Sequence, residues 1–297
     1  MAKLQRRKRR DQAGDEPAAA VADTLVEPAP TDVCTDVPTD VPTDTGADPG
    51  PVRRTPGRRL RLSLSEATPV LLAQAAHPRQ ALFTGFGLGV AALASDRPLR
   101  EAAVVAATGL DGQAILGGHN DSVDRDTDAR HQTPRKPVAE GRLDVGTAWY
   151  AVVLAVLLVI PLSISTGVTA GTWFLGSLAV GLLGNVALRR GRFSWLSWAG
   201  QYALFVPYLS YGGWGGGADG SAPEVAMVVL FALLGVGVHF LRAIWGLVAD
   251  DADGWTYLPL MLGRRLGATR LLVVSATFTG LVLAGIAVAG ATVGLRQ

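Results

Sequence analysis

Long apolar stretches recur along this chain, and they constrain its fold more than any other feature. A membrane-spanning helix needs about 20 apolar residues, because an α-helix rises about 1.5 Å per residue across roughly 30 Å of hydrocarbon. About seven stretches have a suitable length and composition: 80–96, 98–118, 146–164, 169–188, 195–212, 223–243 and 270–294. We therefore predict an all-α protein built as a polytopic bundle of transmembrane helices.

Polar residues gather at the N-terminal side of these stretches. Charged residues make up 18% of the sequence, below the roughly 25% of a soluble globular protein. The first 60 residues are rich in Asp, Thr, Pro and Arg, and a short Thr-Asp repeat occupies 31–44. Such a segment buries too little apolar surface to offset the entropy of ordering. We therefore expect a disordered cytoplasmic tail at 1–59 and a transmembrane domain at 60–297.

The tail itself carries few functional signals. Cys34 is the single cysteine, which excludes a disulfide or a cysteine-based metal site within one chain. The basic cluster at 6–10 is not followed at once by an apolar stretch, so we expect no secretory signal peptide. This cluster either contacts anionic lipid headgroups or is a solvated part of the tail. After the tail, 60–76 mixes apolar and charged residues and predicts an interfacial helix, which Pro69 bends or delays.

Basic residues alternate between the links that join the predicted spans. Lys and Arg are concentrated before the first span and in the links after the second, fourth and sixth spans. The segments 163–172 and 213–224, which fall on the opposite side, contain neither Lys nor Arg. This asymmetry fits a cytoplasmic N-terminus. It also predicts that two acidic segments, 119–144 and 244–269, face the cytoplasm.

The first acidic segment has the spacing of a metal site. If the preceding helix continues, Asp121, Asp124 and Asp128 lie on one helical face at i, i+3 and i+7. Three carboxylates there repel one another unless a cation is bound, and Mg²⁺ commonly bridges carboxylate and phosphate oxygens. The alternative is a set of ordinary charges on a solvated loop. His119 and His131 are near enough to be metal ligands, although helix-end or headgroup roles suit them better.

A proline-rich loop follows at 133–141. Arg135 and Lys136 are placed there to bind phosphate oxygens, Arg as a planar fork and Lys as a point charge. Their alternative role is to fix the topology by the positive charge alone.

These residues resemble the motifs of the UbiA-type intramembrane prenyltransferases over about 60 to 295. Asn120-Asp121-x-x-Asp124-x-x-x-Asp128 matches the first Asp-rich signature of that family, and 135–141 looks like its Arg-Pro-Leu-x-x-Gly loop. The resemblance implies a ring of helices, about seven to nine spans here, around a central cavity. It also implies Mg²⁺-dependent transfer of an isoprenoid chain from a prenyl diphosphate to an acceptor.

Two parts of the family pattern differ in this chain. Where the family often has Tyr-x-x-x-Lys, this chain has Asn185 and Arg189, and Arg189 keeps the charge that binds diphosphate. The second Asp-rich signature aligns through its tail at 258–263, which places Gly246 at the first Asp and Asp250 at the second. Asp251 and Asp253 either compensate from a shifted register or solvate a helix end. The chain also has about one span after this signature, where the family usually has about three.

The resemblance implies a set of site residues. The predicted metal ligands are Asp121, Asp124, Asp128 and Asp250. Asp121, Asp124 and Asp250 are the predicted catalytic residues, and Asn120, Arg135, Lys136 and Arg189 are predicted to bind the diphosphate. Aromatic residues that could shield a carbocation are Trp195, Trp198, Tyr202, Tyr208, Phe240 and Trp245. Most aromatic residues of a membrane protein instead face lipid or lie at the membrane interfaces.

The leading hypothesis is therefore an Mg²⁺-dependent prenyltransferase in the cell membrane. Its partners would be a prenyl diphosphate donor, a lipophilic or aromatic acceptor and membrane lipid, with no nucleic acid. One alternative is a terpene cyclase of the same type, which ionises the donor and cyclises it without an acceptor. Another is a non-catalytic isoprenoid-binding membrane protein, which Gly246 favours.

Overall fold

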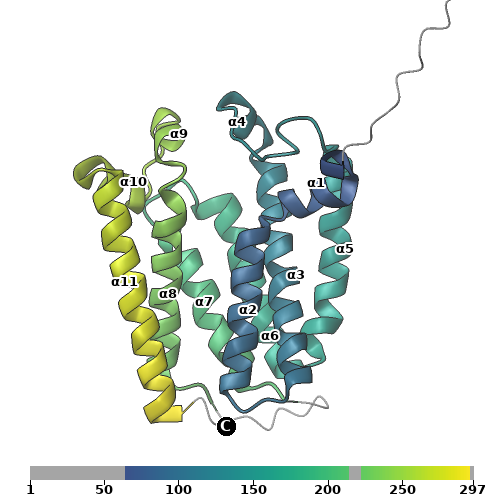
Figure 1. Cartoon of the computed structure of the whole chain (residues 1–297), viewed down its shortest axis with the longest axis vertical. Coiled ribbons are helices and arrows are strands. Elements are labelled where there is room, and N and C mark those ends of the chain that lie inside the picture. The colour runs from purple at the N-terminus through teal and green to yellow at the C-terminus, as the bar shows by residue number, and fades with distance from the viewer. Residues whose placement is uncertain (1–63, 214–221, 295–297) are drawn as a thin grey trace, which may run out of the picture. The chain divides into compact units, whose positions relative to one another are not determined.

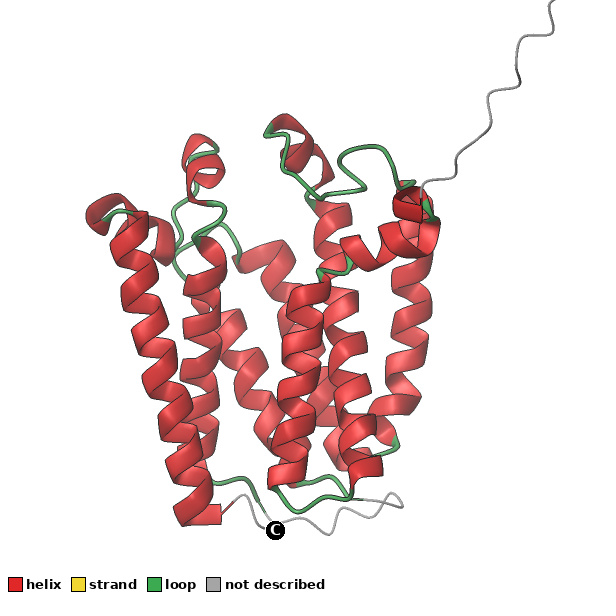
Figure 2. Cartoon of the chain, in the orientation of Figure 1, coloured by secondary structure: helices red, strands yellow, loops and turns green. Residues whose placement is uncertain are grey.

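The computed structural model describes residues 64–213 and 222–294, and the predicted tail at 1–59 lies outside them. All of these described residues belong to one compact unit, Arg59–Gln297. Every regular element that they form is a helix (Figure 2). The prediction of an all-α bundle is confirmed.

Each predicted span corresponds to a long helix. These helices are α2 (Pro78–Ala94), α3 (Leu99–Val123), α5 (Val145–Ile164), α6 (Val168–Leu183), α7 (Ser194–Ser210), α8 (Val225–Ala243) and α11 (Ala268–Ala289). Two of them end in a π-helical turn, Gly184–Leu188 after α6 and Gly290–Gly294 after α11.

Four of these helices are long and apolar enough to cross a membrane by length and composition: α5, α6 with its π turn, α8 and α11. Helices α2 and α7 have 17 residues each, and α3 carries Arg100, Glu101 and Asp111 within its length. Large apolar side chains on the outside of the bundle, such as Phe83 at 79% and Phe86 at 73% exposure, are typical of a lipid-facing surface. The chain is an integral membrane protein.

Helices that follow one another in the sequence pack side by side. Helix α2 packs on α3, α3 on α5, α5 on α6, α6 on α7, α7 on α8 and α8 on α11 (Figure 1). The main core lies among these helices and is centred on large side chains such as Ile115, Phe174 and Tyr208, each at most 2% exposed. This sequential packing brings the ends of distant helices to the same level.

Short elements lie together at one end of the bundle. They are η1 (Leu64–Glu66), α1 (Thr68–Ala75), α4 (Arg125–Arg130), α9 (Leu247–Ala252) and α10 (Leu258–Leu266). Figure 1 shows α1, α4, α9 and α10 at this end. Pro69 stands in the first turn of α1, where its missing N–H has no helical partner, so the predicted late start of this helix is confirmed. Both acidic segments therefore share one mouth of the bundle.

Candidate active site

The first acidic segment is not one continuous helix. Helix α3 ends at Val123, and Asp124 adopts φ −89° and ψ 2° between α3 and α4. The prediction that Asp121, Asp124 and Asp128 share a single helical face is therefore wrong, because the chain turns at the middle carboxylate. As a result Asp121 is 1% exposed and points away from the cavity that Asp124 lines.

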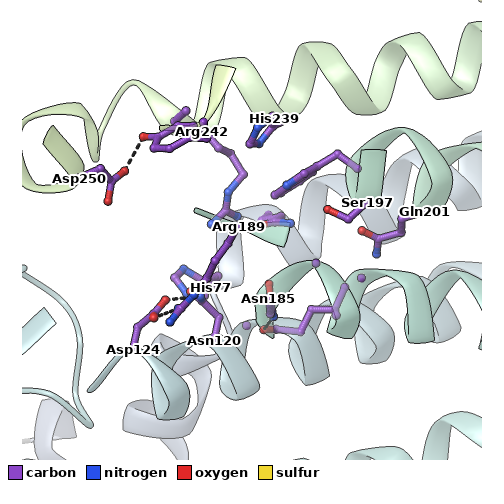
Figure 3. A pocket seen from close by; sticks show the side chains of 18 of the residues that line it. His77, Asn120, Asp124, Asn185, Arg189, Ser197, Gln201, His239, Arg242 and Asp250 are labelled. Atoms are coloured by element: carbon purple, nitrogen blue, oxygen red, sulfur yellow. Dashed lines mark hydrogen bonds and ion pairs between the residues drawn. The ribbon is translucent and has the colours of Figure 1, made fainter. Parts of the chain in front are cut away.

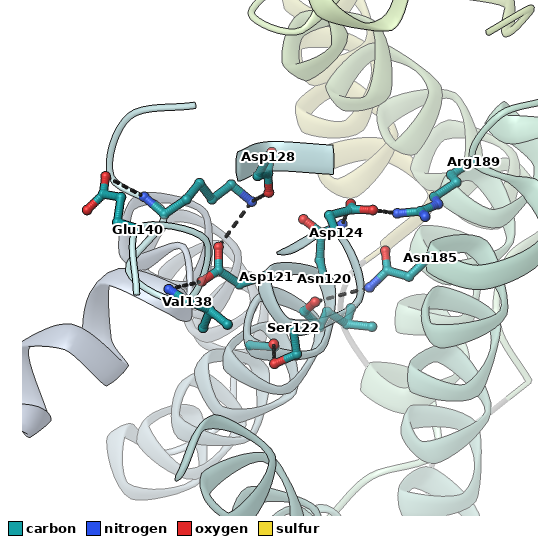
Figure 4. A network of polar contacts seen from close by, with 12 residues as sticks. Asn120, Asp121, Ser122, Asp124, Asp128, Val138, Glu140, Asn185 and Arg189 are labelled. Atoms are coloured by element: carbon teal, nitrogen blue, oxygen red, sulfur yellow. Dashed lines mark hydrogen bonds and ion pairs between the residues drawn. The ribbon is translucent and has the colours of Figure 1, made fainter. Parts of the chain in front are cut away.

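Lys136 holds the two outer carboxylates together. Its Nζ lies 3.2 Å from Asp121 Oδ1 and 3.1 Å from Asp128 Oδ2. Figure 4 labels the two carboxylates and marks their ion pairs with dashed lines. The backbone N–H of Val138 donates to Asp121 Oδ2 at 3.4 Å. Lys136 thus neutralises both carboxylates and fixes the loop to the end of α3. Arg135, by contrast, is exposed and does not line the cavity.

A cavity of about 190 Å³ opens between the ends of α3, α6, α7 and α8. Four residues of the predicted set line it: Asn120, Asp124, Arg189 and Asp250 (Figure 3). Asn120 Nδ2 donates to Asp124 Oδ2 at 2.6 Å, and Arg189 forms an ion pair with the same carboxylate. Charged groups from three separate segments therefore meet at one mouth.

In the second acidic segment, Asp250 is the carboxylate that lines the cavity. The hydroxyl of Tyr257 donates a hydrogen bond to Asp250 Oδ2. Burial raises the pKa of the Asp250 carboxyl above its ordinary value, and burial also raises the pKa of the Tyr257 phenol. Gly246 begins α9 beside this group, and a Cβ added to it would lie 2.8 Å from Asp250 Oδ2.

The other two carboxylates of this segment have partners elsewhere. Asp251 Oδ1 accepts from Arg264 Nε at 2.5 Å on the exposed side of α10. Asp253 Oδ1 lies 3.0 Å from His131 Nε2, and Asp253 Oδ2 lies 3.7 Å from Arg130. The hydrogen bond with His131 holds the pKa of Asp253 below its ordinary range. Neither carboxylate lines the cavity, so neither stands in for the carboxylate absent at Gly246.

The donor set at the mouth suits a hard divalent cation. Within the described residues, no group of three or more His, Cys, Asp or Glu side chains is close enough to form a ready-made metal cage. Magnesium needs no such cage, because it is held by one or two carboxylates together with waters and substrate phosphates. Asp124 and Asp250 supply two carboxylates on one cavity, with the Asn120 carboxamide beside them. The residues present therefore fit Mg²⁺.

Several residues that line the cavity were not predicted from the sequence. They are His77, Gln80, Ser197, Gln201, His239, Arg242, Trp255 and Tyr257. Of the predicted aromatic set, Trp198 lines the cavity, whereas Trp245 is 91% exposed. Gln201, His239 and Arg242 stand on otherwise apolar helices, and polar residues in such helices are themselves a sign of a functional interior.

The family model described as the UbiA prenyltransferase family matches residues 81–295 of this chain. The fold is similar to a UbiA homologue from Archaeoglobus fulgidus bound to GPP and Mg²⁺, with a TM-score of 0.57 and 17% identity over 73% of this chain and 77% of that chain. The same homologue has been solved with DMAPP and Mg²⁺. The apo structure of a UbiA homologue from Aeropyrum pernix K1 matches with a TM-score of 0.55 and 19% identity, over 71% of this chain and 80% of that chain. No curated protein sequence matches this chain.

Proposed function

The chain belongs to the UbiA prenyltransferase family, and from that premise we propose that it is an Mg²⁺-dependent enzyme that transfers an isoprenoid chain inside the membrane. Its donor is a prenyl diphosphate, and its acceptor is an aromatic or lipid-soluble molecule. One observation carries this proposal: carboxylates from both acidic segments and the Arg189 guanidinium line one cavity at the end of the bundle.

The residues at the mouth have different roles in holding the diphosphate. Bound Mg²⁺ would offset the negative charge of the diphosphate and so make it a better leaving group. Asp124 and Asp250 would hold the cation, and Asn120 and Arg189 would donate hydrogen bonds to phosphate oxygens. Lys136, Asp121 and Asp128 do not line the cavity, and Lys136 contacts both of these carboxylates. We propose that the three residues act together at the entrance.

The proposed reaction exchanges one bond for another. The carbon–oxygen bond of the prenyl diphosphate breaks, and its electron pair leaves with the diphosphate. The allylic carbon then forms a bond to the acceptor, which loses a proton. Trp198 and Trp255 line the cavity and present π-faces that stabilise a nearby cationic carbon, as they already do for arginine side chains 5.5 to 5.6 Å away.

The proposed orientation places this mouth at the cytoplasmic face of the cell membrane. Two observations support it. Basic residues are concentrated in the links at this end of the bundle, as the positive-inside rule requires for cytoplasmic links. The same end holds the charged cavity, where a water-soluble diphosphate product would leave.

One experiment tests the reaction. Purified protein in lipid nanodiscs is incubated with Mg²⁺ and a panel of labelled prenyl diphosphates, with and without a membrane lipid extract, and diphosphate release and labelled lipids are measured. Transfer is supported if diphosphate release depends on Mg²⁺ and a new labelled lipid forms only when the extract is present. A cyclised product from the donor alone would instead indicate a cyclase. No diphosphate release from a donor of any chain length would indicate the non-catalytic alternative.

A further inference from the structure

The inner end of the cavity carries polar side chains that the proposed donor site does not use. Gln201 and Ser197 come from α7, and Asn185 comes from the π turn after α6. Figure 3 shows these three side chains toward one side of the pocket, with Asp124 and Asp250 toward the other. The cavity therefore has a charged mouth and an uncharged but polar inner end.

Gln201 is the most informative of these residues. It is 5% exposed and lines the cavity. Its carboxamide packs against α6, where a Cβ added to Gly181 would lie 3.3 Å from Gln201 Cδ. Within the part of the chain that the structure describes, this carboxamide forms no hydrogen bond with the protein. Since buried side-chain amides in native proteins have partners, the partners of this carboxamide are water or a ligand inside the cavity.

The two neighbouring side chains are only partly satisfied. Asn185 Nδ2 donates to the Leu116 carbonyl at 3.1 Å, which leaves its Oδ1 free to accept. The Ser197 hydroxyl donates to the Ser194 carbonyl at 2.9 Å, so the hydroxyl oxygen can still accept a hydrogen bond. An isoprenoid chain placed here would leave all three groups unpaired, which is unfavourable. A polar edge of a ligand would satisfy them.

The charge of the lining restricts that ligand further. Gln201, Asn185 and Ser197 carry no formal charge, and a carboxamide pairs best with a group that donates and accepts side by side.

Building on the proposed function, we infer that the acceptor carries, at the end that enters the cavity, an uncharged donor–acceptor group, such as a carboxamide, that pairs with Gln201. The opposite end of the acceptor then faces the charged mouth, where the prenyl carbon would arrive. This assigns Gln201 as a specificity-determining residue.

Equilibrium binding in the absence of any prenyl diphosphate tests the inference. The probes are 4-hydroxybenzamide, 4-hydroxybenzoate and 4-ethylphenol, which share one ring and differ in the inner group. Binding to the full chain in nanodiscs is followed by calorimetry. We expect the benzamide to bind at least about tenfold more tightly than the other two probes, because one lost buried hydrogen bond changes affinity by about that factor. Equal affinities for the benzamide and the ethylphenol would overturn the inference, as would tightest binding of the benzoate.

Variants assign the preference to the residue. Gln201→Leu should bind the benzamide and the ethylphenol equally, whereas Gln74→Leu, the same change on α1 away from this cavity, should keep the tenfold preference. Gln201→Met, which keeps the volume, serves if the leucine variant does not fold. A preference that survives either folded Gln201 variant refutes the role of Gln201.

Diphosphate release on the same samples separates this inference from the proposed function. The wild-type protein could release diphosphate from a prenyl diphosphate in the presence of Mg²⁺ and yet show no preference for the benzamide. That result would refute the acceptor class and leave the transferase proposal intact. A clear benzamide preference with no release at any donor length refutes the transferase proposal, while the uncharged inner site remains.

Discussion

At the scale of single residues, the site depends on which carboxylate points into the cavity. Asp124 lines the cavity because the chain turns there. Asp121, three residues before it, instead forms an ion pair with Lys136. Asp250 lines the same cavity from the other segment, and Asp251 and Asp253 are paired outside it. The spacing of these carboxylates in the sequence does not distinguish those that line the cavity from those that lie outside it, whereas the fold does.

Asp124→Ala should lower Mg²⁺-dependent diphosphate release by at least about a hundredfold, because the variant removes a carboxylate from the cavity. The protein should still insert and fold, since Asp124 is not part of the packed core. Asp126→Ala is the matched control, because that side chain is 78% exposed and pairs with its neighbour Arg125. Near-normal release by the Asp124 variant would exclude this residue from the site.

Asp250→Asn should end turnover and also change the pH dependence of stability. Burial raises the pKa of Asp250 in the folded state. The protonated side chain therefore contributes to folding stability below the ordinary Asp pKa of about 3.9, and this contribution is lost as the pH rises through the folded-state pKa. The metal-free variant should therefore lose less stability than the wild type as the pH rises above the ordinary Asp pKa. Thermal unfolding in chelator measures this, with Asp251→Asn as the exposed control. Parallel curves for wild type and Asp250→Asn would contradict the prediction.

Gly246→Asp should be tolerated and should tighten Mg²⁺ binding. Gly246 has φ −102°, which any residue adopts, and the group nearest an added Cβ is the movable end of the Asp250 side chain. A second carboxylate beside Asp250 adds negative charge where a cation would bind. Calorimetric titration with Mg²⁺ compares this variant with Gly246→Asn, which has the same size without the charge. Identical affinities would show that position 246 does not face the metal.

At the scale of elements, two short loops meet over the cavity. His131, just after α4, lies 3.0 Å from Asp253, just after α9, and Arg190 accepts a hydrogen bond from the Thr256 N–H at 3.0 Å through its carbonyl. These contacts join segments that are far apart in the sequence. The two acidic segments are therefore held together by neighbours of the proposed ligands rather than by the ligands themselves.

Breaking the contact between His131 and Asp253 should loosen both loops together. We expect His131→Ala to raise backbone hydrogen exchange in α4 and in α9, because the loops lose the shorter of their two side-chain contacts and keep only the one between Arg130 and Asp253 at 3.7 Å. Asp253→Asn should raise exchange in the same two helices, and the double variant should add little, since the two residues share one interaction. Gln132→Ala, next to His131, is the control. Exchange that rises in α4 alone would show that the loops are independent.

At the scale of the whole molecule, the sequential packing of seven long helices brings every acidic residue of the site to one end. Accessibility of that end tests the proposed orientation. In a Cys34→Ser background, single cysteines at Ser122 and Ala252 should be labelled by a membrane-impermeant maleimide only after the cytoplasmic side is opened. A cysteine at Val225, at the opposite end of α8, should be labelled in intact cells. Labelling of either acidic segment from outside would overturn the topology.

The sequence by itself determined the helices and the end at which the chemistry gathers. Apolar stretches of about 20 residues have one stable form in a bilayer, so their number and order follow from composition alone. The acidic signature and Arg189 were likewise visible, because their charges interrupt these stretches. Tertiary structure decided the rest. The Lys136 bridge and the packing of Gln201 against α6 depend on contacts between residues that are separated in the sequence, and the turn at Asp124 directs its carboxylate into a cavity that several helices form together. No local pattern encodes such contacts, because they form only when the helices pack.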